Sequence, residues 1–288
     1  MRNFYLTVFA IFAAFPAIAQ QIAVKSVGLV NERVLANGFY PHFSKDGGLL
    51  FFTTENYQGL KAYDFSSQKI QVLSEDKGAG YGFFQGIDST KVYYNKTEFV
   101  NQRKKNSICT YNLATNTSEQ LTRAVRGASL LKSVSTTIKT DIGAIVYIDN
   151  QQIVYKEGTQ KTILSPNGEQ NSYLWPVISP DGKKIVYVVA GKGAFICDID
   201  GKNIVSLGYL HAPQWINNQW IVGMEDYDDG QNVTSSEIVA VTVDGLTRQN
   251  LTNTSDEKEM YPTVSPTRDK IVFNSYEGKL YMMDVVVE

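Results

Sequence analysis

The chain has 288 residues, of which 43% are hydrophobic and 19% are charged, with 27 Lys and Arg against 29 Asp and Glu. This near balance of charge excludes a general electrostatic attraction to nucleic acid or to anionic lipid. The 17 Tyr and 14 Phe residues favour strands over helices, and the length allows one or two domains.

Residues 1–19 have the features of a secretory signal peptide. Arg2 supplies a positive charge, residues 4–15 form an apolar run too short to span a bilayer, and residues 17–19 form a small-residue cleavage site. We therefore expect an exported protein, periplasmic or extracellular, whose folded domain covers residues 20–288. No Cys directly follows the cleavage site and no later stretch is long and apolar, so we expect neither a lipid anchor nor a transmembrane segment.

A degenerate repeat runs through the rest of the chain. Its clearest copies span residues 40–52, 175–187 and 261–273. Each copy combines a short strand, a tight turn and a second strand rich in β-branched and aromatic residues. In the first two copies an Asp-Gly pair supplies the positive φ of a two-residue hairpin turn, so we predict such a turn there.

Three further copies are more degenerate and span residues 85–94, 140–147 and 211–222. A third and a fourth strand follow each copy, as residues 194–201 and 204–207 illustrate. Four short antiparallel strands every ~40 to 45 residues predict the blades of a β-propeller.

The sequence therefore predicts an all-β, six-bladed propeller with four-stranded antiparallel blades. The blades are expected near residues 36–74, 80–123, 127–165, 173–207, 208–252 and 258–288. The last unit supplies only three strands, and we predict that an N-terminal strand at residues 31–35 completes it and closes the ring. An open β-sandwich or two small β domains are the alternatives, but no linker-like segment divides the chain.

The sequence at residues 175–187, aromatic-Pro-x-x-Ser-Pro-Asp-Gly-Lys-x-Ile-x-Tyr, followed by Asp-x-Asp-Gly at 198–201, resembles the WD40-like repeats of TolB. Related repeats occur in the non-catalytic propeller of prolyl oligopeptidases. The resemblance covers about residues 31–287. It implies a propeller face that binds an envelope protein such as a Pal-like lipoprotein. TolB-like proteins carry an α/β domain before the propeller, and we expect that domain and its inner-membrane partner to be absent here.

Four residues are candidates for a partner-binding site. Aligning the repeats places His211 level with Tyr40, Trp175 and Tyr261, where each enters the first strand of its blade. First strands line the central channel, so these rings are expected to converge at one rim as a stacking or hot-spot platform. The alternative is that the rings cap the core and pack against the adjacent prolines.

Two charged runs have weaker claims to a function. Asp226, Asp228 and Asp229 have spacings that suggest calcium ligands, but Gly230 is one position early for an EF-hand turn, so a solvated hairpin is expected. The basic run at residues 103–105 is expected in the equivalent hairpin of the second blade, also as a solvated turn.

The sequence carries little of what an enzyme needs. Its only histidines are His42 and His211, and no G-x-S-x-G elbow is present. Cys109 and Cys197 are expected in equivalent strands of non-adjacent blades, hence as buried free thiols. We predict a monomeric, non-enzymatic protein without cofactor that binds a protein partner. A glycan- or small-molecule-binding propeller and a hydrolase or lyase with a channel-mouth site remain alternatives.

Overall fold

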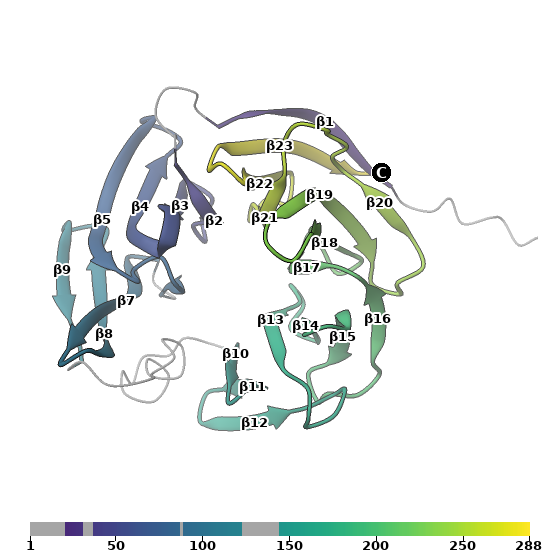
Figure 1. Ribbon diagram of the computed structural model, residues 1–288, viewed down its shortest axis with the longest axis horizontal. Coiled ribbons are helices and arrows are strands. Elements are labelled where there is room, and N and C mark those ends of the chain that lie inside the picture. The colour runs from purple at the N-terminus through teal and green to yellow at the C-terminus, as the bar shows by residue number, and fades with distance from the viewer. Residues whose placement is uncertain (1–20, 31–36, 87–88, 123–143) are drawn as a thin grey trace, which may run out of the picture.

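The computed structural model describes residues 21–30, 37–86, 89–122 and 144–288, and these residues form six antiparallel sheets around a central axis (Figure 1). The predicted all-β six-bladed propeller is therefore confirmed. The one helical element in the described residues is the 3-10 turn η1 (Glu55–Tyr57). No helix of the described chain is long and apolar enough to cross a membrane.

Each blade is built from consecutive strands. Blade one contains β2 (Phe39–Phe43), β3 (Leu49–Thr53), β4 (Gln58–Asp64) and β5 (Lys69–Lys77). Blade two contains β6 (Phe83–Gln85), β7 (Lys91–Val100), β8 (Arg103–Asn112) and β9 (Thr117–Gln120). Blade three shows β10 (Ile145–Asp149), β11 (Gln152–Glu157) and β12 (Gln160–Leu164). This blade has three strands in the described part of the chain, and residues 123–143 lie outside it.

The C-terminal half continues the pattern. Blade four contains β13 (Tyr173–Ile178), β14 (Lys184–Val189), β15 (Gly193–Asp198) and β16 (Val205–Gly208). Blade five contains β17 (His211–Trp215), β18 (Trp220–Asp228), β19 (Val233–Thr242) and β20 (Arg248–Asn250). Blade six contains β21 (Glu259–Val264), β22 (Lys270–Ser275), β23 (Leu280–Val287) and the N-terminal strand β1 (Ile22–Leu29).

The N-terminal strand closes the ring, as predicted, but it lies earlier in the sequence than expected. β1 pairs antiparallel with β23 from Ile22–Val287 to Leu29–Tyr281. The expected strand at residues 31–35 lies outside the described residues. Ile22 explains the earlier position, because its side chain is buried in the core between blades five and six and its backbone bonds to Gln249 of blade five.

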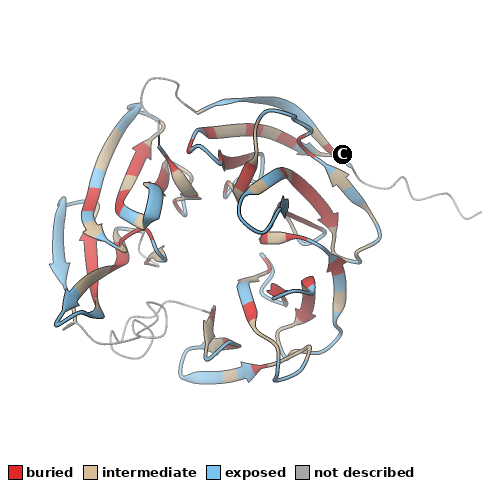
Figure 2. Cartoon of the chain, in the orientation of Figure 1, coloured by how far each residue is buried: buried red, intermediate tan, exposed pale blue. Residues whose placement is uncertain are grey.

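The core consists of apolar layers between neighbouring blades rather than one central mass (Figure 2). Trp220 and Phe273 fill the layer between blades five and six. Cys109 packs between blades one and two, and Cys197 packs between blades three and four. Both cysteines are buried and free in the third strands of their blades, so that prediction is confirmed.

The turn between the first two strands of a blade differs from the predicted two-residue hairpin. In blade one a five-residue loop joins β2 to β3, closed by bonds from the Ser44 N–H to the Leu49 carbonyl (2.8 Å) and from the Gly47 N–H to the Ser44 carbonyl (2.9 Å). Ser44 Oγ donates to Asp46 Oδ1 and accepts from the Leu49 N–H. The serine side chain therefore replaces part of the strand ladder, and Gly47, with φ +76°, turns the chain back.

Candidate functional site

The first strands begin with an unusual backbone. Tyr40, Trp175 and Tyr261 each precede a proline and have φ values of +52°, +46° and +53°. The strand register shifts at each of them, so each is the extra residue of a β-bulge. A left-handed φ is disfavoured for large side chains, so each of these three residues is held at a conformational cost.

The sequence alignment of His211 with these three residues is wrong by one position. In blade five the bulge falls at Ala212, with φ +44°, and Pro213 follows it as Pro41 follows Tyr40. In blade two the equivalent residue is Gly82, with φ +76°, four residues before the loop bond of Gly86. The same backbone is therefore occupied by Tyr, Trp, Ala or Gly in different blades.

One group of rings gathers at blades six, one and two. The rings of Tyr40 and Tyr261 lie 4.3 Å apart, Tyr40 stacks on Tyr57 at 4.5 Å, and Tyr57 meets Tyr81 edge-on at 5.0 Å. Sequence analysis missed Tyr57 and Tyr81. Tyr57 lies in η1 and Tyr81 in the connection to the next blade, both outside the aligned repeat.

A second group gathers at blades four and five. His211 lies 5.6 Å from the ring of Trp175 and 4.8 Å from that of Tyr209, which in turn stacks on Tyr227 at 5.7 Å. Although His211 does not occupy the bulge, its ring still joins the group because it enters the strand one residue earlier. Tyr209, like Tyr81, comes from a connection between blades.

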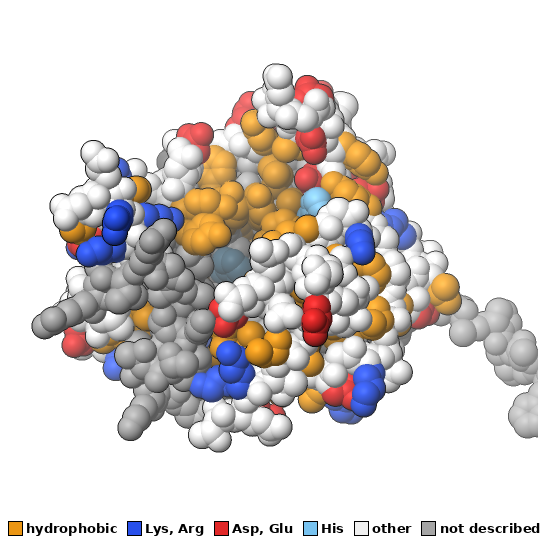
Figure 3. Space-filling model, turned by 60° about the horizontal axis from the view of Figure 1, so that its bottom comes forward, with side chains coloured by type: hydrophobic (Ala, Val, Ile, Leu, Met, Phe, Trp, Pro, Cys, Tyr) orange, Lys and Arg blue, Asp and Glu red, His pale blue; other side chains and the backbone are white. Residues whose placement is uncertain are grey.

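Asp226 anchors two members of the second group. Its Oδ1 lies 2.7 Å from His211 Nδ1, and its carbonyl accepts the Tyr209 hydroxyl at 2.7 Å. Burial raises the pKa of Tyr261. We call the whole set the aromatic arc. It comprises Tyr40, Tyr57, Tyr81, Trp175, Tyr209, His211, Tyr227 and Tyr261, and Figure 3 shows apolar side chains gathered at a hollow in the molecular surface.

The arc is partly open to solvent. Tyr81 is 62% exposed, Tyr227 52%, Tyr209 41% and Trp175 38%, whereas Tyr40 is half-buried. Burial raises the pKa of Tyr40 to about 12, so its hydroxyl is protonated at neutral pH. The arc thus offers ring faces together with hydroxyl groups, and Asp226 holds His211 so that Nε2 is the imidazole nitrogen left for a bound group.

Arg248 supports the second group from blade five. One guanidinium nitrogen lies 2.7 Å from Glu225 Oε2, and another donates to the carbonyls of Leu207 (2.8 Å) and Tyr209 (3.0 Å). Glu225 also accepts the Tyr227 hydroxyl. These bonds fix the connection that carries Tyr209 against the strand that carries Tyr227.

The acidic run forms the hairpin between β18 and β19, as predicted. Asp228 accepts from the Gly230 N–H, and Asp229 accepts from the N–H groups of Gln231 and Asn232, which lowers the pKa of Asp229. Asp226 instead contacts His211. The structure does not bring the three carboxylates together, and within the described ranges no three His, Cys, Asp or Glu residues form a group suited to a metal ion.

His42 lies apart from the arc, on β2. Its ring meets Phe83 edge-on at 5.3 Å. Solvent reaches the imidazole, yet protein atoms crowd around it, and the resulting loss of hydration lowers the pKa to about 4. His42 is therefore neutral at pH 7.

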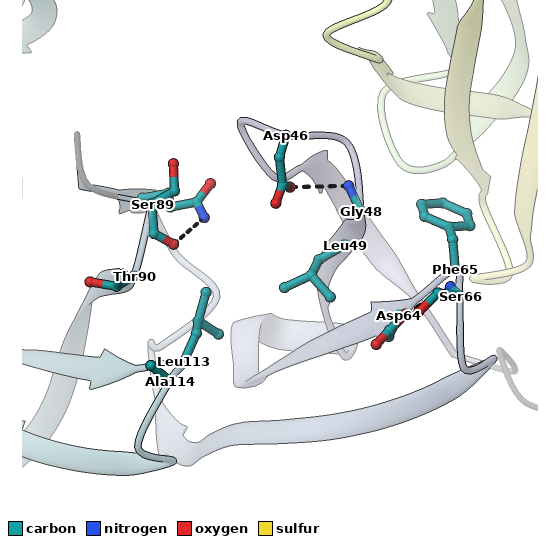
Figure 4. Close-up of a pocket in the computed structure, with 11 residues that line it drawn as sticks. Asp46, Gly48, Leu49, Asp64, Phe65, Ser66, Ser89, Thr90, Leu113 and Ala114 are labelled. Atoms are coloured by element: carbon teal, nitrogen blue, oxygen red, sulfur yellow. Dashed lines mark hydrogen bonds between the residues drawn. The ribbon is translucent and has the colours of Figure 1, made fainter.

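The opposite face carries a groove of about 730 Å³ between blades one and two (Figure 4). Its carboxylates are bonded within their own turns, Asp46 to the Gly48 N–H and Asp64 to the N–H and hydroxyl of Ser66. These bonds lower the pKa of both carboxyl groups. The carboxylates of this groove are thus already engaged, which makes it a weaker candidate than the arc.

Comparison with known proteins supports the fold and no more. No protein-family model and no curated protein match the sequence. A gluconolactonase from Xanthomonas campestris is similar with a TM-score of 0.55 and 9% identity, covering 90% of this chain and 89% of that one. An oligogalacturonate lyase in complex with manganese has a TM-score of 0.50 and 16% identity over 87% of this chain and 78% of that one.

TolB from Acinetobacter baumannii is also similar, with a TM-score of 0.48 and 14% identity over 87% of this chain and 64% of that one. The six sheets of the chain agree with the propeller fold that its repeats predict. Propellers support unrelated functions, so these likenesses assign none to this chain.

Proposed function

We propose that this chain is an exported propeller that binds a protein partner through the aromatic arc. The observation that carries the proposal is the identity of the residues at the strand entries. Tyr40, Trp175 and Tyr261 hold large rings on a left-handed backbone that Gly82 and Ala212 adopt elsewhere in the same ring of blades.

The backbone itself does not require these rings. A left-handed φ costs a residue with a side chain roughly 1 kcal/mol compared with glycine. Blade two uses glycine at this position, and blade five uses alanine. Rings retained at a conformational cost, and partly exposed, are better explained by contact with another molecule than by the fold.

The chemistry of the arc suits a protein partner. Tyrosine and tryptophan give large, amphipathic contact areas and are enriched where binding energy concentrates. The rings do not form one flat platform, because Tyr40 and Tyr261 are tilted by 54° and Tyr57 and Tyr81 by 88°. An irregular surface of this kind favours interlocking side chains over the face of a sugar ring.

The location of the partner follows from the N-terminus. Residues 1–19 have the order of charge, apolar run and cleavage site that directs export, so the partner is expected in the periplasm or outside the cell. The resemblance to TolB makes a Pal-like lipoprotein one candidate partner.

A capture experiment from native envelope extract tests the proposal. The mature protein is compared with a Trp175→Ala, Tyr261→Ala variant and with a matched control, Phe65→Ala, Leu113→Ala, in the groove of the opposite face. We expect a specific protein with the wild type and the control, and at least a tenfold loss with the arc variant. Equal capture by all three, or no specific capture by any, would overturn the proposal.

A further inference from the structure

Two long hairpins stand at the ends of the aromatic arc. β7 and β8 form one, with ten residues in each strand, and β18 and β19 form the other, with nine and ten. Both join the second and third strands of their blades, so both project from the face that carries the arc. We call residues 99–105 the basic arm and residues 225–232 the acidic arm.

The basic arm combines positive charge with exposed apolar side chains. Arg103 and Lys104 are exposed, and Lys104 Nζ lies 6.0 Å from the centre of the Tyr81 ring at one end of the arc. Glu98, opposite Lys105 in the strand pairing, forms its ion pair with Lys96 at 3.6 Å. Phe99 at the tip is 66% exposed. Positive charge is therefore in excess where the arc ends.

The acidic arm carries the opposite charge at the other end. Tyr227 of this arm stacks on Tyr209, and the exposed carboxylates of Asp228 and Asp229 follow it. Arg248 neutralises Glu225. Asp226, Asp228 and Asp229 outnumber the nearby Lys258, so negative charge is in excess at this end.

The arc and the arms thus form one surface with an apolar middle and two charged ends. Figure 3 shows the apolar side chains gathered at the hollow, with charged side chains around them. Opposite charges on the two sides favour a partner whose charges are reversed, and they repel a partner of uniform charge from one end or the other.

We propose that the segment bound by the arc is an extended polypeptide with an apolar or aromatic middle, an acidic end and a basic end. This inference rests on the proposed function. Its acidic end lies on the basic arm and its basic end on the acidic arm. Ring-to-ring steps of 4.3 to 5.7 Å within the two groups of rings call for a segment of at least roughly ten extended residues to span both groups.

Three synthetic peptides of about ten residues, with one shared Tyr- and Leu-containing middle, test this assignment. One has two Glu at one end and two Lys at the other, one has Glu at both ends, and one has Lys at both ends. Binding to the mature protein is measured by fluorescence anisotropy at low and high salt. We expect the bipolar peptide to bind at least tenfold more tightly than either other peptide, with an advantage that shrinks as salt is added.

Charge reversal supplies the decisive control. Arg103→Glu, Lys104→Glu makes both arms acidic, and we expect this variant to lose about tenfold for the bipolar peptide and to prefer the Lys peptide. Adding Asp228→Lys, Asp229→Lys swaps the arms, and because a short peptide can turn around, bipolar binding is expected to return. A folded swap variant without rescue would overturn the inference, and circular dichroism establishes that it is folded.

The outcomes also separate this inference from the proposed function. If the envelope partner is lost with Trp175→Ala, Tyr261→Ala but is unaffected by charge reversal, the arc binds its partner without the arms and only the bipolar assignment falls. If the three peptides bind equally, the assignment falls in the same way. If neither partner nor peptide depends on the arc, both proposals fail.

Discussion

The two faces of the propeller are built from the two ends of the same repeat, yet they use their side chains differently. The turn face is the one that carries the loops between the first and second strands of the blades. In each of three such loops a serine bonds to a nearby aspartate and to the backbone N–H that starts the second strand; these serines are Ser44, Ser179 and Ser265. On the face that carries the aromatic arc, Tyr40 and Trp175 adopt a left-handed backbone, and their rings contact Tyr261 and His211.

The comparison shows how to separate folding from function within a repeat. The serine and aspartate groups satisfy one another locally, so their contribution is to the stability of each blade. Glycine would adopt the left-handed backbone of Tyr40 and Trp175 with less strain, whereas the Tyr261 ring also packs on the core between blades five and six. This division between the two faces can be tested by mutation.

The largest effect on stability is expected on the turn face. Ser179→Ala removes the hydroxyl that donates to Asp181 at 2.7 Å and accepts from the Lys184 N–H at 2.9 Å. Because Ser179 is buried, the loss should lower the free energy of unfolding by about 1–2 kcal/mol, measured by urea denaturation. Partner capture should be unchanged. A loss of capture by a stably folded Ser179→Ala protein would contradict the division between the faces.

A smaller effect is expected at Glu259, a buried carboxyl whose Oε1 accepts from Thr254 and whose pKa is raised from 4.5 by burial and by Glu237. A raised pKa means that ionisation costs the folded state more than the unfolded state, so the cost appears as pH rises above 4.5. Glu259→Gln should therefore gain up to about 1 kcal/mol over the wild type at pH 7 and little at pH 4. Equal differences at both pH values would exclude this cause.

At pH 7 the smallest effect is expected at His42, whose pKa is lowered to about 4. Between pH 6.5 and 4 the unfolded chain binds this proton and the folded chain does not, so the folded state loses stability as pH falls through that range. His42→Gln should reduce the loss. An NMR titration of the His42 ring should give a midpoint near 4, and a midpoint near 6.5 would show that the ring is hydrated.

The sequence was sufficient for the blades because strand alternation and turn residues recur in it once per blade. It misplaced the closing strand, since β1 is specified by the burial of Ile22 against blade five, a contact between residues far apart in the chain. It placed His211 one residue from its true register because the alignment followed aromatic residues, whereas the bulge in this blade falls on Ala212, before Pro213.

The arc was only half predictable for a similar reason. Tyr40, Trp175 and Tyr261 lie inside the repeat, where alignment finds them. Tyr81 and Tyr209 lie in connections between blades, which no repeat copy aligns, and they join the arc through the closure of the ring. A search for aromatic residues just before each first strand would have found both.

Whether the Trp175 ring serves binding or the fold is tested most directly by comparing Trp175→Gly with Trp175→Ala and the wild type, in both urea unfolding and partner capture. Glycine should be more stable than alanine by about 1 kcal/mol, because it adopts φ +46° without strain. We predict that Trp175→Gly stays within about 1 kcal/mol of the wild type while partner binding falls at least tenfold. A loss of about 3–5 kcal/mol with binding intact would instead show that the ring caps the core, and it would contradict the account.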